Sequence, residues 1–149
     1  EQSIAEFLPI LPNQPIILYA IWQKATTITF DNNGGTGTMT TQTIIAGESD
    51  NLYENTFTRE GYTFTGWNTV AEPTEQDPGE AYEDQAEYTA VEGETKDVTL
   101  YAQWEIIEYT ISFNTNQGTG AQTAVTVTYG SEMTEITVAP TRTGFVFTG

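Results

Sequence analysis

The sequence predicts an α+β fold that is strongly β-rich and built from tandem units of about 80 residues. Three observations lead to this prediction. Motifs recur in the same order at nearly one spacing, apolar residues alternate with polar ones in short segments, and Gly and Asn separate those segments. We expect mostly strands, with at most one short helix per unit.

The repeat is visible in four blocks. The block 18–22 (LYAIW) returns 82 residues later as 100–104 (LYAQW). Three further blocks return 83 residues later: 28–31 as 111–114, 35–37 as 118–120, and 59–66 as 142–149. Because four blocks keep their order at nearly one offset, they define an internal repeat.

The spacing divides the chain into three parts. Residues 25–105 form one complete repeat, residues 1–24 form the C-terminal part of a preceding repeat, and residues 106–149 form the N-terminal half of a following repeat. Only the complete unit contains every block, so we expect only this unit to close its own core. The chain is then a piece of a longer array.

The complete unit shows the pattern of half-buried strands. Ile28 and Phe30 alternate with threonines, and Leu100, Ala102 and Trp104 share one face of their segment. Residues 33–35 (NGG) favour a tight turn, which predicts an antiparallel pair of strands around them.

Two segments depart from this pattern. Residues 46–58 are the place expected for a short helix, which Ser49 or Asp50 would cap. Residues 72–93 are acidic and contain Pro73 and Pro78, which predicts a long exposed loop.

Composition excludes several classes of function. Lys and Arg number 4 against 21 Asp and Glu, and the net charge of -17 repels the phosphates of nucleic acids. The sequence has no His and no Cys, which excludes Ser–His–Asp and Cys–His catalysis, the usual zinc ligands and disulfides. We therefore expect neither an enzyme nor a nucleic-acid partner.

No membrane insertion is expected either. The most apolar stretch, Phe7 to Trp22, is too short to span a bilayer and contains Pro9, Pro12 and Pro15. No basic segment precedes it, so it does not have the pattern of an export signal.

Blocks from the whole chain resemble one known family. Residues 30–35 (FDNNGG), 59–67 (REGYTFTGW) and 100–104 (LYAQW), together with 127–131 (VTYGS) and 140–145 (PTRTGF), are similar to the Listeria–Bacteroides repeat, the internalin-type B-repeat. The resemblance implies a β-grasp-like module of large exported proteins, located outside the cell or on its surface. It also implies a role as a stalk or an adhesive module. The acidic segment 72–93 is longer than the family pattern.

The repeated blocks also name the residues expected to build the fold. These structural motif residues are Phe30, Gly35, Arg59, Gly61, Tyr62, Phe64, Trp67, Leu100, Tyr101, Trp104, Phe113, Arg142 and Phe145. We expect both Trp104 and Trp67 in the core, with Trp67, which follows Gly66, at a bulge or strand end. Arg59 and Arg142 are expected to hold a carboxylate or backbone carbonyls of their own unit.

Candidate binding residues are few. Trp67 and Tyr82 are the aromatic residues that would contact a ligand if their rings were exposed. No cofactor is expected. Calcium is the cation that the acidic loop would bind, but the oxygens it requires have no recognisable spacing here. Asp31 begins such a pattern, which then fails at its fifth position.

We therefore interpret the chain as a non-catalytic stalk, spacer or adhesion module whose partners are the neighbouring repeats. One alternative is a module that binds a host-surface protein or glycan through exposed aromatic residues. Another is a filament subunit, in which the strand at 16–22 of one molecule completes the C-terminal half-unit of the next.

Overall fold

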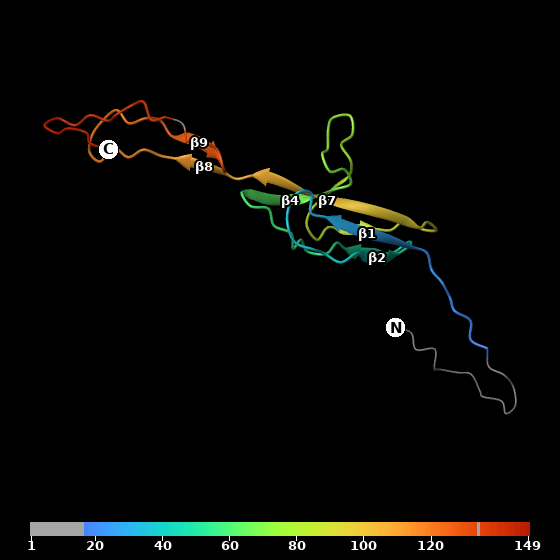
Figure 1. Ribbon diagram of the computed structural model, residues 1–149. Helices are drawn as coiled ribbons and strands as arrows, with labels where there is room; N and C mark the ends of the chain where they lie inside the picture. The colour runs from blue at the N-terminus through green and yellow to red at the C-terminus, as the bar shows by residue number, and fades with distance from the viewer. Residues whose placement is uncertain (1–16, 134) are drawn as a thin grey trace.

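The computed structural model describes residues 17–133 and 135–149, and every regular element in them is a strand (Figure 1). The strands, in chain order, are β1 (Ala25–Asp31), β2 (Gln42–Ile45), β3 (Ser49–Asn51), β4 (Tyr62–Asn68), β5 (Ala81–Tyr82), β6 (Glu87–Thr89), β7 (Lys96–Ile106), β8 (Glu108–Ile111) and β9 (Val125–Thr128). The strongly β-rich fold is thus confirmed. The β-grasp assignment stays a prediction.

The complete unit is organised around one mixed sheet with the strand order β2-β1-β7-β4-β5. β1 and β7 are parallel neighbours, with Ile28 opposite Val98 and Phe30 opposite Leu100. The other pairs in the sheet are antiparallel. β7 is therefore the central strand, hydrogen-bonded on both edges, and the alternation of its apolar residues places one face toward the core.

The helix expected over residues 46–58 is wrong. Ser49–Asn51 forms β3, which pairs with β6, and the rest of that segment has no helical residue. Local capping signals at Ser49 and Asp50 favoured a helix, but pairing with a strand about forty residues away is the stronger constraint.

The core lies between the mixed sheet and the layer that contains the β3–β6 pair. It consists of Ile28, Phe30, Ile44, Leu52, Phe57, Trp67, Tyr88, Ala90, Val98, Leu100 and Ala102. Leu52, Phe57, Tyr88 and Ala90 come from the second layer, which therefore covers the sheet as a helix would in other two-layer folds.

The long exposed loop predicted for residues 72–93 is only partly correct. The stretch contains β5, which extends the main sheet, and β6, and Tyr88 and Ala90 within it are buried. Residues 72–78 are exposed and form the part that protrudes from the sheet in Figure 1.

The turn after β1 differs from a simple hairpin. β1 and β2 pair antiparallel, as predicted, but the turn at Asn33 leads the chain first to a bridge between Thr36 and Thr58. Asn33 has a positive φ of 46°, and its amide donates to Oδ1 of Asp31 at 2.8 Å.

The half-unit repeats this local geometry. β8 pairs with β9 in the register that β1 has with β2, and a bridge between Thr119 and Thr141 matches the bridge between Thr36 and Thr58. Not one of the described residues from 106 onward is buried, however. The described part of the half-unit thus has the first strand pair and the bridge of a repeat, without a buried core.

The described residues contain no helix long and apolar enough to cross a membrane. Most of the apolar stretch Phe7 to Trp22, and most of the preceding part-repeat 1–24, lie outside the described residues. Residues 17–24 are described and exposed.

Candidate functional site

The two candidate ligand residues take different positions. Trp67 follows a register shift between Phe64 and Gly66, which confirms the expected bulge, and its side chain is only 1% exposed. Its ring centroid lies 5.0 Å from those of Phe30 and Phe64. The indole is a central part of the core, so its faces are covered by its own unit.

Tyr82 is half-buried on β5 and contacts its own chain. Its ring packs on Tyr88 with centroids 5.6 Å apart, and its hydroxyl donates to Oε2 of Glu80 at 2.9 Å. Burial is the largest cause, and the hydrogen bond to Glu80 the next, of a rise in the pKa of Tyr82 to about 12. The hydroxyl thus already has a hydrogen-bond acceptor two residues away in its own chain.

The two repeated arginines lie on aromatic rings. The guanidinium carbon of Arg59 lies 4.0 Å from the ring centroid of Tyr62, and that of Arg142 lies 4.2 Å from the centroid of Phe145. Arg59 also donates to the carbonyl of Asn33 at 3.5 Å. Each arginine thus contacts the segment that follows it, and Arg59 also contacts the turn after β1.

Trp104, near the end of β7, contacts three parts of the complete unit. Its indole N–H donates to the carbonyl of Asn32 at 2.9 Å, and its ring centroid lies 5.6 Å from that of Phe64. A Cβ built on Gly35 would lie 2.9 Å from Cζ2 of the indole. The indole therefore fills the space between the turn after β1 and the start of β4. Leu100 is buried, and Tyr101 is half-buried.

The connection between the units contains one residue outside the strands, Ile107. Its amide donates to the carbonyl of Gly61 at 2.9 Å, and its carbonyl accepts from the amide of Tyr129 at 2.8 Å. The hydroxyl of Tyr129 donates to Oε1 of Glu60 at 2.6 Å. We call Glu60, Gly61, Ile107 and Tyr129 the joint.

The ring of Tyr129 lies directly against Gly61, since a Cβ built there would overlap Cδ1, Cγ and Cε1 of the ring. The hydrogen bond to Glu60, and then the charge of Glu60, raise the pKa of Tyr129. Gly61 was expected as a structural motif residue, but Tyr129 was not identified as a functional residue. The sequence signal that could have found it is a difference between the two units: its counterpart 83 residues earlier is Ala46, which is not aromatic.

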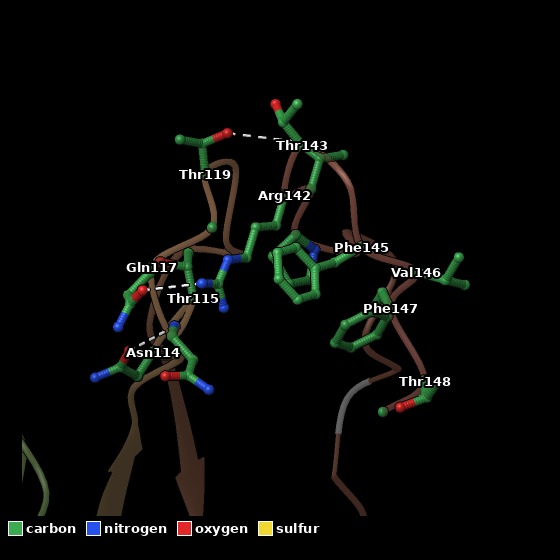
Figure 2. Close-up of a pocket in the computed structure, with 15 residues that line it drawn as sticks. Asn114, Thr115, Gln117, Thr119, Arg142, Thr143, Phe145, Val146, Phe147 and Thr148 are labelled. Atoms are coloured by element: carbon green, nitrogen blue, oxygen red, sulfur yellow. Dashed lines mark hydrogen bonds between the residues drawn. The ribbon is translucent and has the colours of Figure 1, made fainter.

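The half-unit contains an open cavity of about 850 Å³ between the turn after β8 and the C-terminal segment (Figure 2). Arg142 reaches across it to donate to Oε1 of Gln117 at 2.9 Å, and Phe145 and Phe147 lie beside it. No Asp or Glu lines this cavity. Phe113, another motif residue, is half-buried two residues after the end of β8.

Among the described residues, no group of three or more Asp or Glu is placed to hold a metal ion. The acidic side chains of the segment 72–93 therefore do not converge in this structure.

Comparisons with known proteins give one consistent result. The model of the Listeria-Bacteroides repeat domain matches residues 27–103 and 109–149. No solved structure matches the chain.

Three curated relatives are similar over most of the chain. A "Putative Gly-rich membrane protein" of Evansella cellulosilytica is 35% identical over 89% of this chain and 15% of its own length. A "Putative membrane protein" of the same organism is 32% identical over 90% of this chain and 18% of its own length. Internalin H of Listeria monocytogenes is 35% identical over 85% of this chain and 20% of its own length.

The chain therefore spans a fifth or less of the length of these relatives. The family model covers well over half of the chain in two consecutive matches. These two matches contain the two equivalent strand pairs, β1–β2 and β8–β9, so the repeat in the sequence and in the structure is that of a known module. The chain belongs to the Listeria-Bacteroides repeat domain family.

Proposed function

We propose that the chain is a non-catalytic spacer of a bacterial surface protein, in which successive repeats are held end to end. The observation that carries the proposal is the parallel pairing of β1 and β7. Because the first and last strands of the complete unit run in the same direction, the chain enters at one end of the sheet and leaves at the other. Repeats joined in this way extend a structure rather than fold back on it.

The joint supports the same role. A one-residue connection leaves little freedom, and both polar backbone groups of Ile107 are hydrogen-bonded, one to each unit. The ring of Tyr129 against Gly61 adds a contact that fixes the direction in which β8 leaves β7. Two backbone bonds and one packed ring are expected to give a stiff connection.

Composition and the relatives support a non-catalytic role at the cell surface. A chain without His and Cys lacks the usual nucleophile and base pairs. Two relatives are named as membrane proteins and one as an internalin, which supports a place at the cell surface. An adhesive role by exposed aromatics receives less support, because Trp67 is in the core.

The stiffness of the joint can be measured by a spin-label distance. Thr43 on β2 and Thr126 on β9 are exposed counterparts in the two units, and the chain has no Cys of its own. Cysteines at these two positions, each labelled, should give a narrow distance distribution in double electron–electron resonance. A broad distribution in the otherwise unchanged chain would overturn the spacer proposal.

A matched pair of variants isolates the contribution of the tyrosine contact. Gly61 and Gly144 are counterparts with φ of 77° and 81°, so alanine meets similar backbone strain at both. Only Gly61→Ala places a methyl group in the ring of Tyr129, because nothing lies near a Cβ at Gly144. We expect the distance distribution to broaden in Gly61→Ala and to stay narrow in Gly144→Ala.

A further inference from the structure

We propose that the complete unit is a mechanical clamp, which resists tension along the chain because β1 and β7 must slide past each other before the unit can open. Such a role goes beyond that of a spacer, which requires a fixed length and direction but no resistance to force. The clamp consists of the parallel ladder between β1 and β7 and of two side-chain hydrogen bonds at the end of that ladder. It does not depend on the stiffness of the joint.

The first support is the direction in which tension acts on the two strands. The chain enters β1 at one end of the mixed sheet and leaves β7 at the other end (Figure 1). Tension therefore draws β1 toward its N-terminus and β7 toward its C-terminus, along the strands and across their hydrogen bonds. The ladder runs from Thr26 opposite Lys96 to Asp31 opposite Tyr101. Because the bonds of a parallel ladder are evenly spaced, sliding stretches all of them together.

The second support is the position of the ladder inside the sheet. β1 lies between β2 and β7, and β7 lies between β1 and β4, so neither strand has an open edge. On the core face Ile28 and Leu100 are completely buried, and Thr26 is 2% exposed. Water therefore reaches the ladder bonds neither from the core nor from an edge of the sheet. Hydrogen bonds shielded from water are electrostatically stronger, which should raise the force needed to break them.

The third support is a pair of side-chain bonds beyond the last residue pair of the ladder. Nδ2 of Asn33 donates to the carbonyl of Ala102 at 2.9 Å, and the indole N–H of Trp104 donates to the carbonyl of Asn32 at 2.9 Å. A second bond from Nδ2 to the carbonyl of Ala71, also at 2.9 Å, holds the amide of Asn33 in place. Sliding of β7 past β1 would break the first two bonds, so they share the load with the ladder.

The experiment pulls single molecules of the 149-residue chain in two directions with optical tweezers. The chain has no Cys of its own, and Gln23, Thr95 and Glu108 are exposed, so pairs of introduced cysteines can carry the handles. Gln23→Cys with Glu108→Cys applies the force along the chain and makes the strands slide. Gln23→Cys with Thr95→Cys pulls on the adjacent N-terminal ends of β1 and β7, which separates the strands one residue pair at a time.

The force at which the unit opens should be several times higher with handles at Gln23 and Glu108 than with handles at Gln23 and Thr95, at the same loading rate. The same contacts are broken in both cases, so the difference measures the direction of the force alone. Equal opening forces in the two directions would overturn the clamp. They would leave the spacer role untouched, since that role is tested by the distance between labels at Thr43 and Thr126.

Asn33→Gly tests the side-chain bonds of the clamp. It removes the Nδ2 donor, while glycine adopts the φ of 46° without strain. We expect a lower opening force with handles at Gln23 and Glu108, because the load is then shared by fewer bonds. With handles at Gln23 and Thr95 the opening force should hardly change, because separation begins at the opposite end of the ladder. An equal drop in both directions would show a general loss of stability and refute the role of Asn33.

Gln42→Leu is the matched control within the same unit. Gln42 is buried, and its amide bonds to the backbone of Asn51 and Tyr53, away from β7. It should lower the urea concentration at the unfolding midpoint but reduce the opening force along the chain less than Asn33→Gly does. The reason is that forced unfolding depends on the barrier rather than on the free energy of unfolding. If the opening force simply follows the urea midpoint across these variants, the clamp is refuted.

Discussion

The indole N–H of Trp104 donates to the carbonyl of Asn32 at 2.9 Å, and this bond joins the end of β7 to the turn after β1. The two residues are 72 positions apart, so the bond closes the complete unit across nearly its whole length. Since β7 is the central strand, the same bond ties the sheet to the turn that Arg59 contacts.

Trp104→Phe should lower the free energy of unfolding of the complete unit. The phenyl ring keeps most of the contact with Phe64, but the carbonyl of Asn32 loses its donor. We expect a loss of about 1–2 kcal/mol, the cost of a part-buried hydrogen bond and a small loss of packing. Urea unfolding followed by fluorescence measures it, and a variant as stable as the unchanged chain would contradict the assigned bond.

Gly35→Ala should also destabilise the complete unit, through a clash. A Cβ at this position would lie 2.9 Å from both Cζ2 of Trp104 and the carbonyl oxygen of Thr58. Such a contact costs about 1–3 kcal/mol in a packed site. The cost should be smaller in a Trp104→Ala background, because one of the two clashes is gone. Equal costs in both backgrounds would mean that the indole does not restrict this glycine.

Gln42 is a buried amide whose polar groups have partners. Its Nε2 donates to the carbonyl of Asn51 at 2.8 Å, and its Oε1 accepts from the amide of Tyr53 at 3.1 Å. Gln42→Leu keeps the volume but leaves the carbonyl of Asn51 and the backbone amide of Tyr53 without their hydrogen-bond partner. It should therefore lower the free energy of unfolding by about 2–4 kcal/mol. The adjacent exposed Thr43→Val is the control, with an expected change below about 0.5 kcal/mol. Similar effects of the two variants would contradict the role given to the amide.

Local sequence patterns predicted where the strands lie better than they predicted which strands pair with one another. The alternation at Leu100, Tyr101 and Ala102 correctly placed the buried face of β7, because period two follows from strand geometry alone. The parallel pairing of β1 with β7 and the pairing of β3 with β6 join residues far apart in the chain. No local propensity encodes such pairings, which is why the helix expected near Ser49 was wrong.

For the candidate sites, too, the sequence predicted local features but not contacts between distant parts of the chain. The repeat identified Gly61 and Arg59 as structural motif residues, since their blocks return 83 residues later. The matching blocks did not identify Tyr129, because it differs from its counterpart Ala46, and only a search for such differences between the units would have found it. The position of Trp67 also needed the structure: the bulge at Gly66 was expected, but the choice between a buried and an exposed ring depends on the layer formed by β3 and β6.

The joint should loosen at alkaline pH. The neutral hydroxyl of Tyr129 donates to Glu60, and this bond and the charge of Glu60 raise the pKa of Tyr129 above its usual value of 10.0. The contribution of the bond is therefore complete below the ordinary pKa of tyrosine and is lost as the pH rises through the raised pKa. The distance distribution between labels at Thr43→Cys and Thr126→Cys should stay narrow near neutral pH and broaden above that raised pKa.

Glu60→Gln supplies the control for this pH dependence. Glutamine can still accept the hydrogen bond, but it carries no charge, so the pKa of Tyr129 should move back toward its usual value. NMR of a chain labelled at the tyrosine ring carbons resolves the titration of Tyr129 from that of Tyr82, whose pKa of about 12 makes it a separate reference. The broadening should then occur at a lower pH in Glu60→Gln than in the unchanged chain. If Tyr129 titrates identically in both chains, Glu60 does not set its pKa, and the hydrogen bond across the joint is not formed in solution.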